Sequence, residues 1–380
     1  MLKITVEGKE LKGIIEKVLC NMDKKSALSL LTKVILSDDG SKLTAYTSDL
    51  QGYLQVNTNN YVSEGTAASI GIDEEDLKVL LKMTGDVTIT ETEDNIIIKN
   101  GKKNVSLMKY DISDFPQIPE EEFVNILQFN ENDFAETITN LSIFTSDNES
   151  NKLMQCLHFN LTDNRIETLD GHRIGMKTIN ENEKLINEGK FLVNNTIVYD
   201  LRKALDKKSN NKVVISQTDK HIKVSGSNFT YIQRRVEGEY FRVNQMLTTN
   251  FDISFKVDTE EMLSHVKYYA DNVIAKTDRK PIIFKIENKT LTSYARNTRF
   301  EVSDCMDIEN HLGEDLTIGF NPYFWIDVLK VSDSDTVLIG GNNCKAPFFI
   351  NAKEYSFVIL PVNLNSEIDA MEKYLAKIAA

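Results

Sequence analysis

The residues best able to do chemistry in this chain form the run Asp170-Gly171-His172-Arg173. The carboxylate of Asp170 and the imidazole of His172 could act as an acid and base pair. Hydrolytic chemistry would also need a nucleophile or a metal, and no serine, cysteine or group of metal ligands accompanies this pair at a suitable spacing. A second interpretation is a turn with a structural aspartate and a packed histidine. We therefore expect a protein that is not an enzyme, with no catalytic residues, no metal and no cofactor.

This run lies within a longer pattern that occurs three times. Each copy reads as a short alternating strand, an acidic turn, and a helix with apolar residues at spacings of three and four. The equivalent apolar positions are Val6, Phe129 and Val257, then Leu11, Phe134 and Met262, then Ile15, Ile138 and Val266. The offsets, 129 − 6 = 123 and 257 − 129 = 128 residues, suit whole domains and are too long for a solenoid repeat.

A second strand and helix recur in each copy, at residues 70–81, 191–205 and 318–329, and hairpin turns separate the remaining strands. Two helices packed on antiparallel sheet form a common α+β arrangement. The sequence therefore predicts an α+β protein of three repeated domains, each of antiparallel sheet with two helices. Their expected ranges are 1–122, 123–248 and 249–364, followed by a C-terminal extension at 365–380.

Composition narrows the class of protein. The 380 residues are 41% hydrophobic and 27% charged, as in ordinary globular domains. The four cysteines are widely spaced, which favours reduced thiols in a cytoplasmic protein, and no stretch has a signal-peptide or membrane-spanning pattern. A net charge of −13 argues against binding to nucleic acid by overall attraction, although a local basic surface remains compatible with it.

Several motifs then point to a family. They are Thr47-Ser48-Asp49-Leu50, Leu169-Asp170-Gly171-His172-Arg173-Ile174, Ile318-Gly319-Phe320-Asn321, Asp114-Phe115-Pro116 and Leu360-Pro361-Val362-Asn363-Leu364. In this order, and with three α+β copies, the chain resembles the bacterial sliding clamp, the beta subunit of DNA polymerase III, over about residues 1–364. The resemblance implies the DNA-clamp fold and a head-to-tail homodimer that closes into a ring around duplex DNA.

The resemblance also implies partners and sites. Such a clamp slides on double-stranded DNA without reading sequence, and it tethers the replicative polymerase, the clamp loader and repair proteins through one peptide cleft per chain. The cleft is expected at Met154, Gly171, His172, Arg173, Ile174, Met246, Leu247, Asn321, Phe324, Val358, Ile359, Leu360, Pro361 and Val362. DNA contacts are expected from Lys12, Lys25, Lys78, Lys82, Arg202, Lys203 and Lys267. The dimer interface is expected at Val105, Leu107, Val273 and Ile274.

Two departures from the family affect these expectations. The family usually has an aromatic-proline pair where this chain has Tyr240-Phe241, so we expect that wall of the cleft to differ from the family's. The extension places Ile368, Met371, Leu375 and Ile378 on one helical face. We expect this helix to pack in the cleft or on the adjoining third-domain sheet and to compete with partner peptides; the alternative is a disordered tail. The alternative function is a clamp-like interaction scaffold that no longer encircles DNA.

Overall fold

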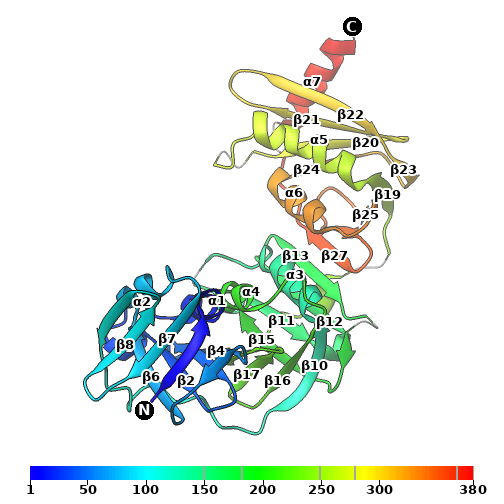
Figure 1. The fold of residues 1–380 in the computed structure, drawn as a ribbon. Coiled ribbons are helices and arrows are strands. Elements are labelled where there is room, and N and C mark those ends of the chain that lie inside the picture. Colours follow the sequence, from blue (N-terminus) through cyan, green and yellow to red (C-terminus); the bar gives the residue numbers. More distant parts are fainter. Residues whose placement is uncertain (149, 181–182, 248–249, 278–279, 365–366, 380) are drawn as a thin grey trace. The chain divides into compact units, whose positions relative to one another are not determined.

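The computed structural model describes residues 1–148, 150–180, 183–247, 250–277, 280–364 and 367–379 (Figure 1). The chain forms two compact units. Unit 1 contains Met1–Thr139 and Glu181–Glu237, and unit 2 contains Asn140–Asn180 and Gly238–Ala380. Residues of the expected second domain therefore contribute to both units. Its expected boundary at 248 and 249, and positions 365, 366 and 380 of the extension, lie outside the described residues.

Unit 1 contains two antiparallel sheets. The first has the order β5 (Tyr61–Ser63), β1 (Lys3–Glu7), β7 (Asp86–Glu91), β8 (Asn95–Asn100) and β9 (Lys103–Met108). The second has the order β14 (Lys184–Leu185), β10 (Val124–Asn130), β16 (Lys212–Gln217), β17 (His221–Ser225), β18 (Phe229–Arg234), β4 (Gly52–Thr58), β3 (Leu43–Ser48), β2 (Lys33–Asp38) and β6 (Ala68–Asp73). Because β18 pairs with β4, this sheet joins strands of the first and second copies.

Unit 2 repeats this arrangement. One sheet contains the order β11 (Cys156–Asn160), β12 (Arg165–Leu169), β13 (Arg173–Thr178), β27 (Tyr355–Ile359), β26 (Phe348–Asn351), β25 (Thr336–Gly341), β19 (Ile253–Asp258) and β23 (Glu309–Leu312). The other has the order β22 (Glu301–Asp307), β21 (Thr290–Arg296), β20 (Ile282–Glu287) and β24 (Leu316–Phe320). Here the pairing of β13 with β27 joins the second copy to the third. Strand β15 covers Lys190–Asn194.

Within the described ranges, six helices belong to the repeated pattern: α1 (Gly8–Val18), α2 (Glu74–Leu80), α3 (Glu131–Ser142), α4 (Asn195–Ala204), α5 (Thr259–Asn272) and α6 (Pro322–Val331). Short 3-10 helices occur at Leu19–Asn21, Ser29–Thr32, Leu161–Asp163 and Val243–Met246. The second helix of each copy starts in the same way, since Asp73, Asn194 and Asn321 each accept a hydrogen bond from the backbone N–H two residues further on. The predicted α+β class, with antiparallel sheets and two helices per copy, is confirmed.

The extension forms a seventh helix, α7 (Glu367–Ala379), in unit 2 (Figure 1). Met371 is fully buried against Ile283 of β20 and Tyr294 of β21, and Ile368 and Leu375 pack beside it. The opposite face of β20 turns toward α6, because Phe284 packs against Trp325. Helix α7 therefore covers the second face of the β20–β21 sheet. Among the described residues, no helix has both the length and the apolar character that crossing a membrane requires.

Candidate functional site

The run Asp170-Gly171-His172-Arg173 forms a tight turn between β12 and β13. The Oδ1 atom of Asp170 accepts hydrogen bonds from the backbone N–H groups of His172 (2.8 Å) and Arg173 (3.0 Å). Gly171 has a φ of +90°, a left-handed conformation that suits glycine because it has no Cβ. This turn starts β13 at Arg173 and leaves the side chain of His172 exposed.

Arg173 is the most fully bonded side chain of the turn. Its Nε donates to Asp170 (2.8 Å), its Nη1 to Asp327 of α6 (2.6 Å), and its Nη2 to the carbonyl oxygen of Ile143 (2.9 Å). The guanidinium also lies over the rings of Phe144 and Phe324, 5.0 and 4.6 Å from their centroids. Removing one partner of a buried ion pair is costly, so Arg173 fixes the turn, α6 and the end of α3 to one another.

These contacts favour a structural role for the aspartate. Both carboxylate oxygens of Asp170 hold the turn and Arg173, and neither is aimed at His172's ring. Among the described residues, no group of three or more histidine, cysteine, aspartate or glutamate side chains could hold a metal ion. Burial raises the pKa of Cys156 to about 12, and burial together with the charge of Asp200 raises that of Cys20 to about 12, so both thiols stay protonated at neutral pH.

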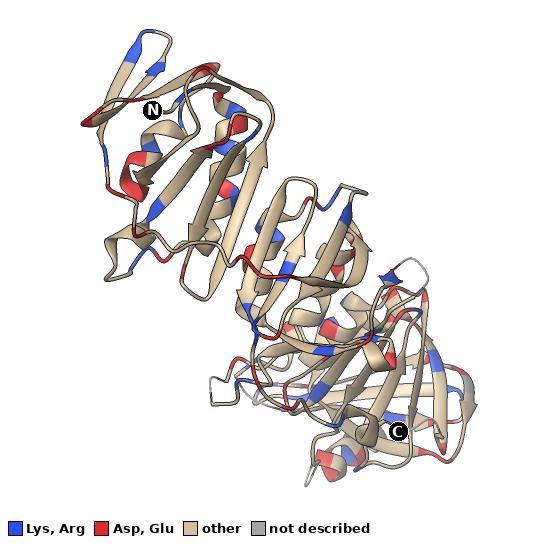
Figure 2. Cartoon of the chain, turned by 90° about the horizontal axis from the view of Figure 1, so that it is seen from below, with Lys and Arg blue, Asp and Glu red and all other residues tan. Residues whose placement is uncertain are grey.

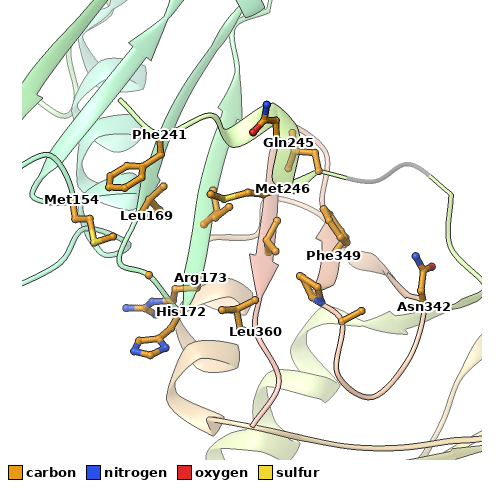
Figure 3. Close-up of a pocket in the computed structure, with 16 residues that line it drawn as sticks. Met154, Leu169, His172, Arg173, Phe241, Gln245, Met246, Asn342, Phe349 and Leu360 are labelled. Atoms are coloured by element: carbon orange, nitrogen blue, oxygen red, sulfur yellow. The ribbon is translucent and has the colours of Figure 1, made fainter. Parts of the chain in front are cut away.

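A cleft of about 630 Å³ adjoins this turn, wholly within unit 2 (Figure 3). Its walls are mainly apolar. Nine of the residues expected from the sequence line it: Met154, Gly171, His172, Arg173, Ile174, Met246, Leu247, Val358 and Leu360. Figure 3 shows Met154, Met246 and Leu360 projecting toward the same hollow from separate segments. An apolar cleft with few polar groups suits a short hydrophobic peptide.

Five expected residues are not part of this lining, and their positions explain why. Ile359 alternates with Val358 and Leu360 along the strand, so its side chain is buried on the other face. Val362 forms a bridge with Gly319 of β24, beyond the cleft, and Pro361 separates it from Leu360. Asn321 caps α6. Phe324 stacks on His172, with ring centroids 6.1 Å apart.

The sequence interpretation missed part of the lining. The additional residues are Leu169, Phe241, Gln245, Asn342, Ala346, Pro347 and Phe349. Phe241 stands where the family usually has its aromatic-proline pair, and it does form a wall of the cleft. Asn342, Ala346 and Pro347 belong to the connection between β25 and β26, and only the Gly340-Gly341 turn signal marked that segment.

The expected DNA contacts lie on helices or next to them. Six of the seven side chains are exposed: Lys12, Lys25, Lys78, Lys82, Arg202 and Lys203; Lys267 of α5 is half-buried. In unit 1, α1 and α4 pack together and form a shallow groove whose lining includes Lys17, Lys24, Tyr199 and Lys203. Figure 2 shows Lys and Arg interspersed with Asp and Glu along the chain. The expected contacts are therefore single basic side chains on or beside helices, in a chain that is acidic overall.

The expected interface residues lie near two sheet edges. Strand β9 ends its sheet in unit 1, and β22 ends its sheet in unit 2. Within β9, Leu107 is buried and Val105 half-buried. Val273 and Ile274, at the end of α5, are also buried within unit 2, and the amide of Asn297, just before β22, donates to the carbonyl oxygen of Val273 (3.3 Å).

Three α+β copies joined by cross-copy strand pairs, with a peptide-sized cleft beside one such pair, define the DNA-clamp class of fold. The sequence model of one protein family, described as the central domain of the DNA polymerase III beta subunit, matches residues 128–241. Over nearly its full length the chain is 21% identical to the beta sliding clamp of Chlamydia muridarum (96% of this chain, 100% of the relative). It is 20% identical to that of Bacillus subtilis (95% and 99%).

Solved structures agree with these sequence matches. A solved structure of a DNA polymerase III beta subunit from Eubacterium rectale is 26% identical to this chain, with a TM-score of 0.89. The match covers 96% of this chain and 100% of that one. The sliding clamp of Bacillus subtilis has the same fold at 18% identity, with a TM-score of 0.87 over 95% of this chain and 99% of that one. Residues 128–241 therefore match the central domain of the DNA polymerase III beta subunit, and the chain is similar to beta sliding clamps over nearly its full length.

Proposed function

We propose that this chain is a DNA sliding clamp, a processivity factor that holds a replicative polymerase on duplex DNA without catalysing a reaction itself. The observation that carries the proposal is the match in fold and length to a DNA polymerase III beta subunit, with a TM-score of 0.89 and 26% identity over 96% of the chain. Tethering alone raises the effective concentration of a polymerase at its template, so the function needs no active site.

The cleft of unit 2 is the proposed docking site for partner proteins. Val358 and Leu360 supply an apolar floor, and Arg173 holds the adjoining turn in place through Asp170 and Asp327. Partners of this chemistry would be short apolar peptides from the replicative polymerase, the clamp loader and repair proteins. Burial of one leucine-sized side chain contributes about 1.5–3 kcal/mol, enough to govern a weak peptide interaction.

The exposed basic residues on the helices are the proposed DNA contacts. Lysine and arginine contacts to phosphates position a protein on DNA without reading the base sequence. Binding should therefore be insensitive to sequence and should weaken with salt, since neutralised phosphates release their counterions. Closure of the ring by two chains is proposed from two strands that end their sheets, β9 and β22, because a strand at a sheet edge can pair with another chain.

The experiment that tests this function measures two properties of the same preparation. Size-exclusion chromatography with light scattering should give a dimer. After loading by the cognate clamp loader, the protein should remain on circular DNA and leave when that DNA is linearised. A variant with Lys12, Lys78, Arg202 and Lys203 all changed to glutamate should be loaded poorly, whereas one with Lys42 and Lys353, on hairpin tips, changed to glutamate should behave as wild type. A monomeric protein that binds cleft peptides would favour the interaction scaffold instead.

A further inference from the structure

The strand that forms the floor of the cleft is followed closely in the chain by the C-terminal helix. Strand β27 ends at Ile359, and Leu360, the next residue, lines the cleft. Helix α7 begins a short distance further on, at Glu367. The last residues of a domain are poorly ordered unless something ties them down. The contacts between Leu360 and α7 therefore decide how firmly this wall of the cleft is held.

Backbone hydrogen bonds hold the start of this segment. The N–H group of Leu360 donates to the carbonyl oxygen of His172 (2.9 Å), and that of Val362 donates to the carbonyl oxygen of Gly319 (2.8 Å). Pro361, between them, has no N–H group to donate. The segment therefore leads from the turn beside the cleft to β24, a strand of the other sheet in unit 2.

A glycine in β24 makes room for the side chain at the end of this segment. A Cβ atom on Gly319 would collide with Cδ2 of Leu364, so Leu364 lies directly against the backbone of the strand. Gly319 pairs with Ile283, and Ile283 pairs with Tyr294. Directly paired residues point to the same face of a sheet. Leu364 therefore packs on the face that α7 covers.

Leu364 and α7 share one apolar cluster on that face. Leu364 is 7% exposed, and it packs with the fully buried Met371 against Ile283 and Tyr294. The carbonyl oxygen of Leu364 also accepts a hydrogen bond from the N–H group of Glu367, the first residue of α7 (2.8 Å). Without the helix, the side of Leu364 that faces Met371 would be open to water. Docking of α7 therefore stabilises the end of the cleft segment.

We infer that α7 acts as a clasp for the cleft: by holding Leu364 against β24, it keeps residues 360–364 ordered and keeps Leu360 in place for a partner peptide. The inference rests on the proposed docking role of the cleft. Leu364 and Met371 are positioning residues, because the described lining contains neither of them. A peptide binds only those molecules whose cleft is in the competent form, so its apparent Kd rises as that fraction falls.

A charge beneath the helix tests the clasp in the full-length protein. Met371→Asp should undock α7, because it places a carboxylate at a fully buried position. A fluorescein-labelled hexapeptide of glutamine, leucine and phenylalanine is the probe. Its affinity should fall roughly tenfold, as expected when about one tenth of the molecules keep an ordered cleft segment. Ala376→Asp adds the same side chain at an exposed position of α7 and should bind as wild type.

Kinetics separate positioning from the loss of a contact. If Met371→Asp lowers the fraction of competent molecules, the association rate constant should fall and the dissociation rate constant should stay unchanged. Leu360→Ser, which removes a contact in the cleft, should instead raise the dissociation rate constant. A faster dissociation from Met371→Asp, with association unchanged, would overturn the positioning role.

Hydrogen exchange shows where order is lost. In Met371→Asp the amides of Leu360 and Val362 should lose nearly all protection, while the amides of β19 stay protected. Equal loss of protection in β19 would mean that the whole unit opens, and it would overturn the clasp. Leu364→Ala is a milder second variant, and it should weaken peptide binding in the same way even if Met371→Asp does not fold.

The remaining outcomes distinguish this inference from the proposed function. Equal affinity of wild type, Met371→Asp and Leu364→Ala would overturn the clasp and leave the docking role of the cleft intact. Tighter binding by Met371→Asp would also overturn it, since α7 would then compete with the peptide. A wild type that does not bind the probe would overturn both the docking role and the clasp.

Discussion

Arg296 of β21 holds Glu367, the first residue of α7, through two parallel hydrogen bonds from Nε (2.8 Å) and Nη2 (3.1 Å). Bidentate pairs of this kind fix orientation as well as distance. A ring contact between Tyr294 and Tyr374, with centroids 5.6 Å apart, secures the middle of the helix. Helix α7 is therefore anchored to the β20–β21 sheet, and the described part of the cleft lining contains no residue of this helix.

This anchoring predicts a stability role for the extension. Met371→Ala should lower the free energy of unfolding of unit 2 by about 2–5 kcal/mol, because it leaves a cavity beneath a fully buried side chain. Ile378→Ala, at a 57% exposed position on the same helix, should change it by less than about 0.5 kcal/mol. Urea denaturation of the two variants makes the comparison. Equal losses for both would mean that α7 is not packed as described.

The cleft predicts a contrast between two nearby residues. Leu360→Ser should reduce the affinity for an apolar clamp-binding peptide by tens of fold, as expected from about 1.5–3 kcal/mol of lost burial. Val362→Ser should leave affinity nearly unchanged, since Val362 bridges to Gly319 outside the lining. Fluorescence anisotropy with a labelled peptide measures both, and light scattering checks that both variants keep the oligomeric state of the wild type. A strong effect of Val362→Ser would extend the site beyond the described cleft.

The sequence predicted the repeats because each copy keeps the same spacing of apolar residues, and this spacing reflects local helix and strand geometry. A turn at Asp170 is one of the interpretations that the sequence allows, and the resemblance to the family places Val358 and Leu360 in the cleft, where the structure has them. The sequence could not predict Asn342 or Phe349 in the cleft, because their positions depend on the pairing of β13 with β27, far apart in the chain. The helical stripe of the extension indicated a buried face, but a stripe alone does not say which surface covers it.

Asp200 of α4 and Asp327 of α6 each stand six residues after the residue that caps their helix, Asn194 and Asn321. Asp200 gives the stability of the protein a dependence on pH. Asp327 pairs with Arg173, the third residue after Asp170, whereas the third residue after Asp49 is Gly52, which has no side chain to pair with Asp200. Burial, and then repulsion from Asp49, raise the pKa of Asp200 from 3.8 to about 7. The folded state therefore favours the protonated carboxyl group.

The sign of the effect follows from that shift. Because the pKa is higher in the folded state than in the unfolded one, unfolded chains release this proton first, and stability falls as pH rises from about 4 to about 7. Asp200→Asn removes the penalty. This variant should match the wild type near pH 4 and exceed it at pH 8, by at most roughly 4 kcal/mol for three pKa units.

Asp327→Asn is the matched comparison, and its effect at pH 8 should have the opposite sign. It removes the anionic partner of Arg173, so it should destabilise unit 2 where Asp200→Asn stabilises unit 1. Hydrogen exchange of the backbone amides in α4 and α6, measured at pH 5 and 8 and corrected for the intrinsic pH dependence of exchange, reports each unit separately. If protection in α4 rises with pH in the wild type, or if Asp200→Asn leaves it unchanged, then Asp200 is not the group whose protonation controls the stability of unit 1.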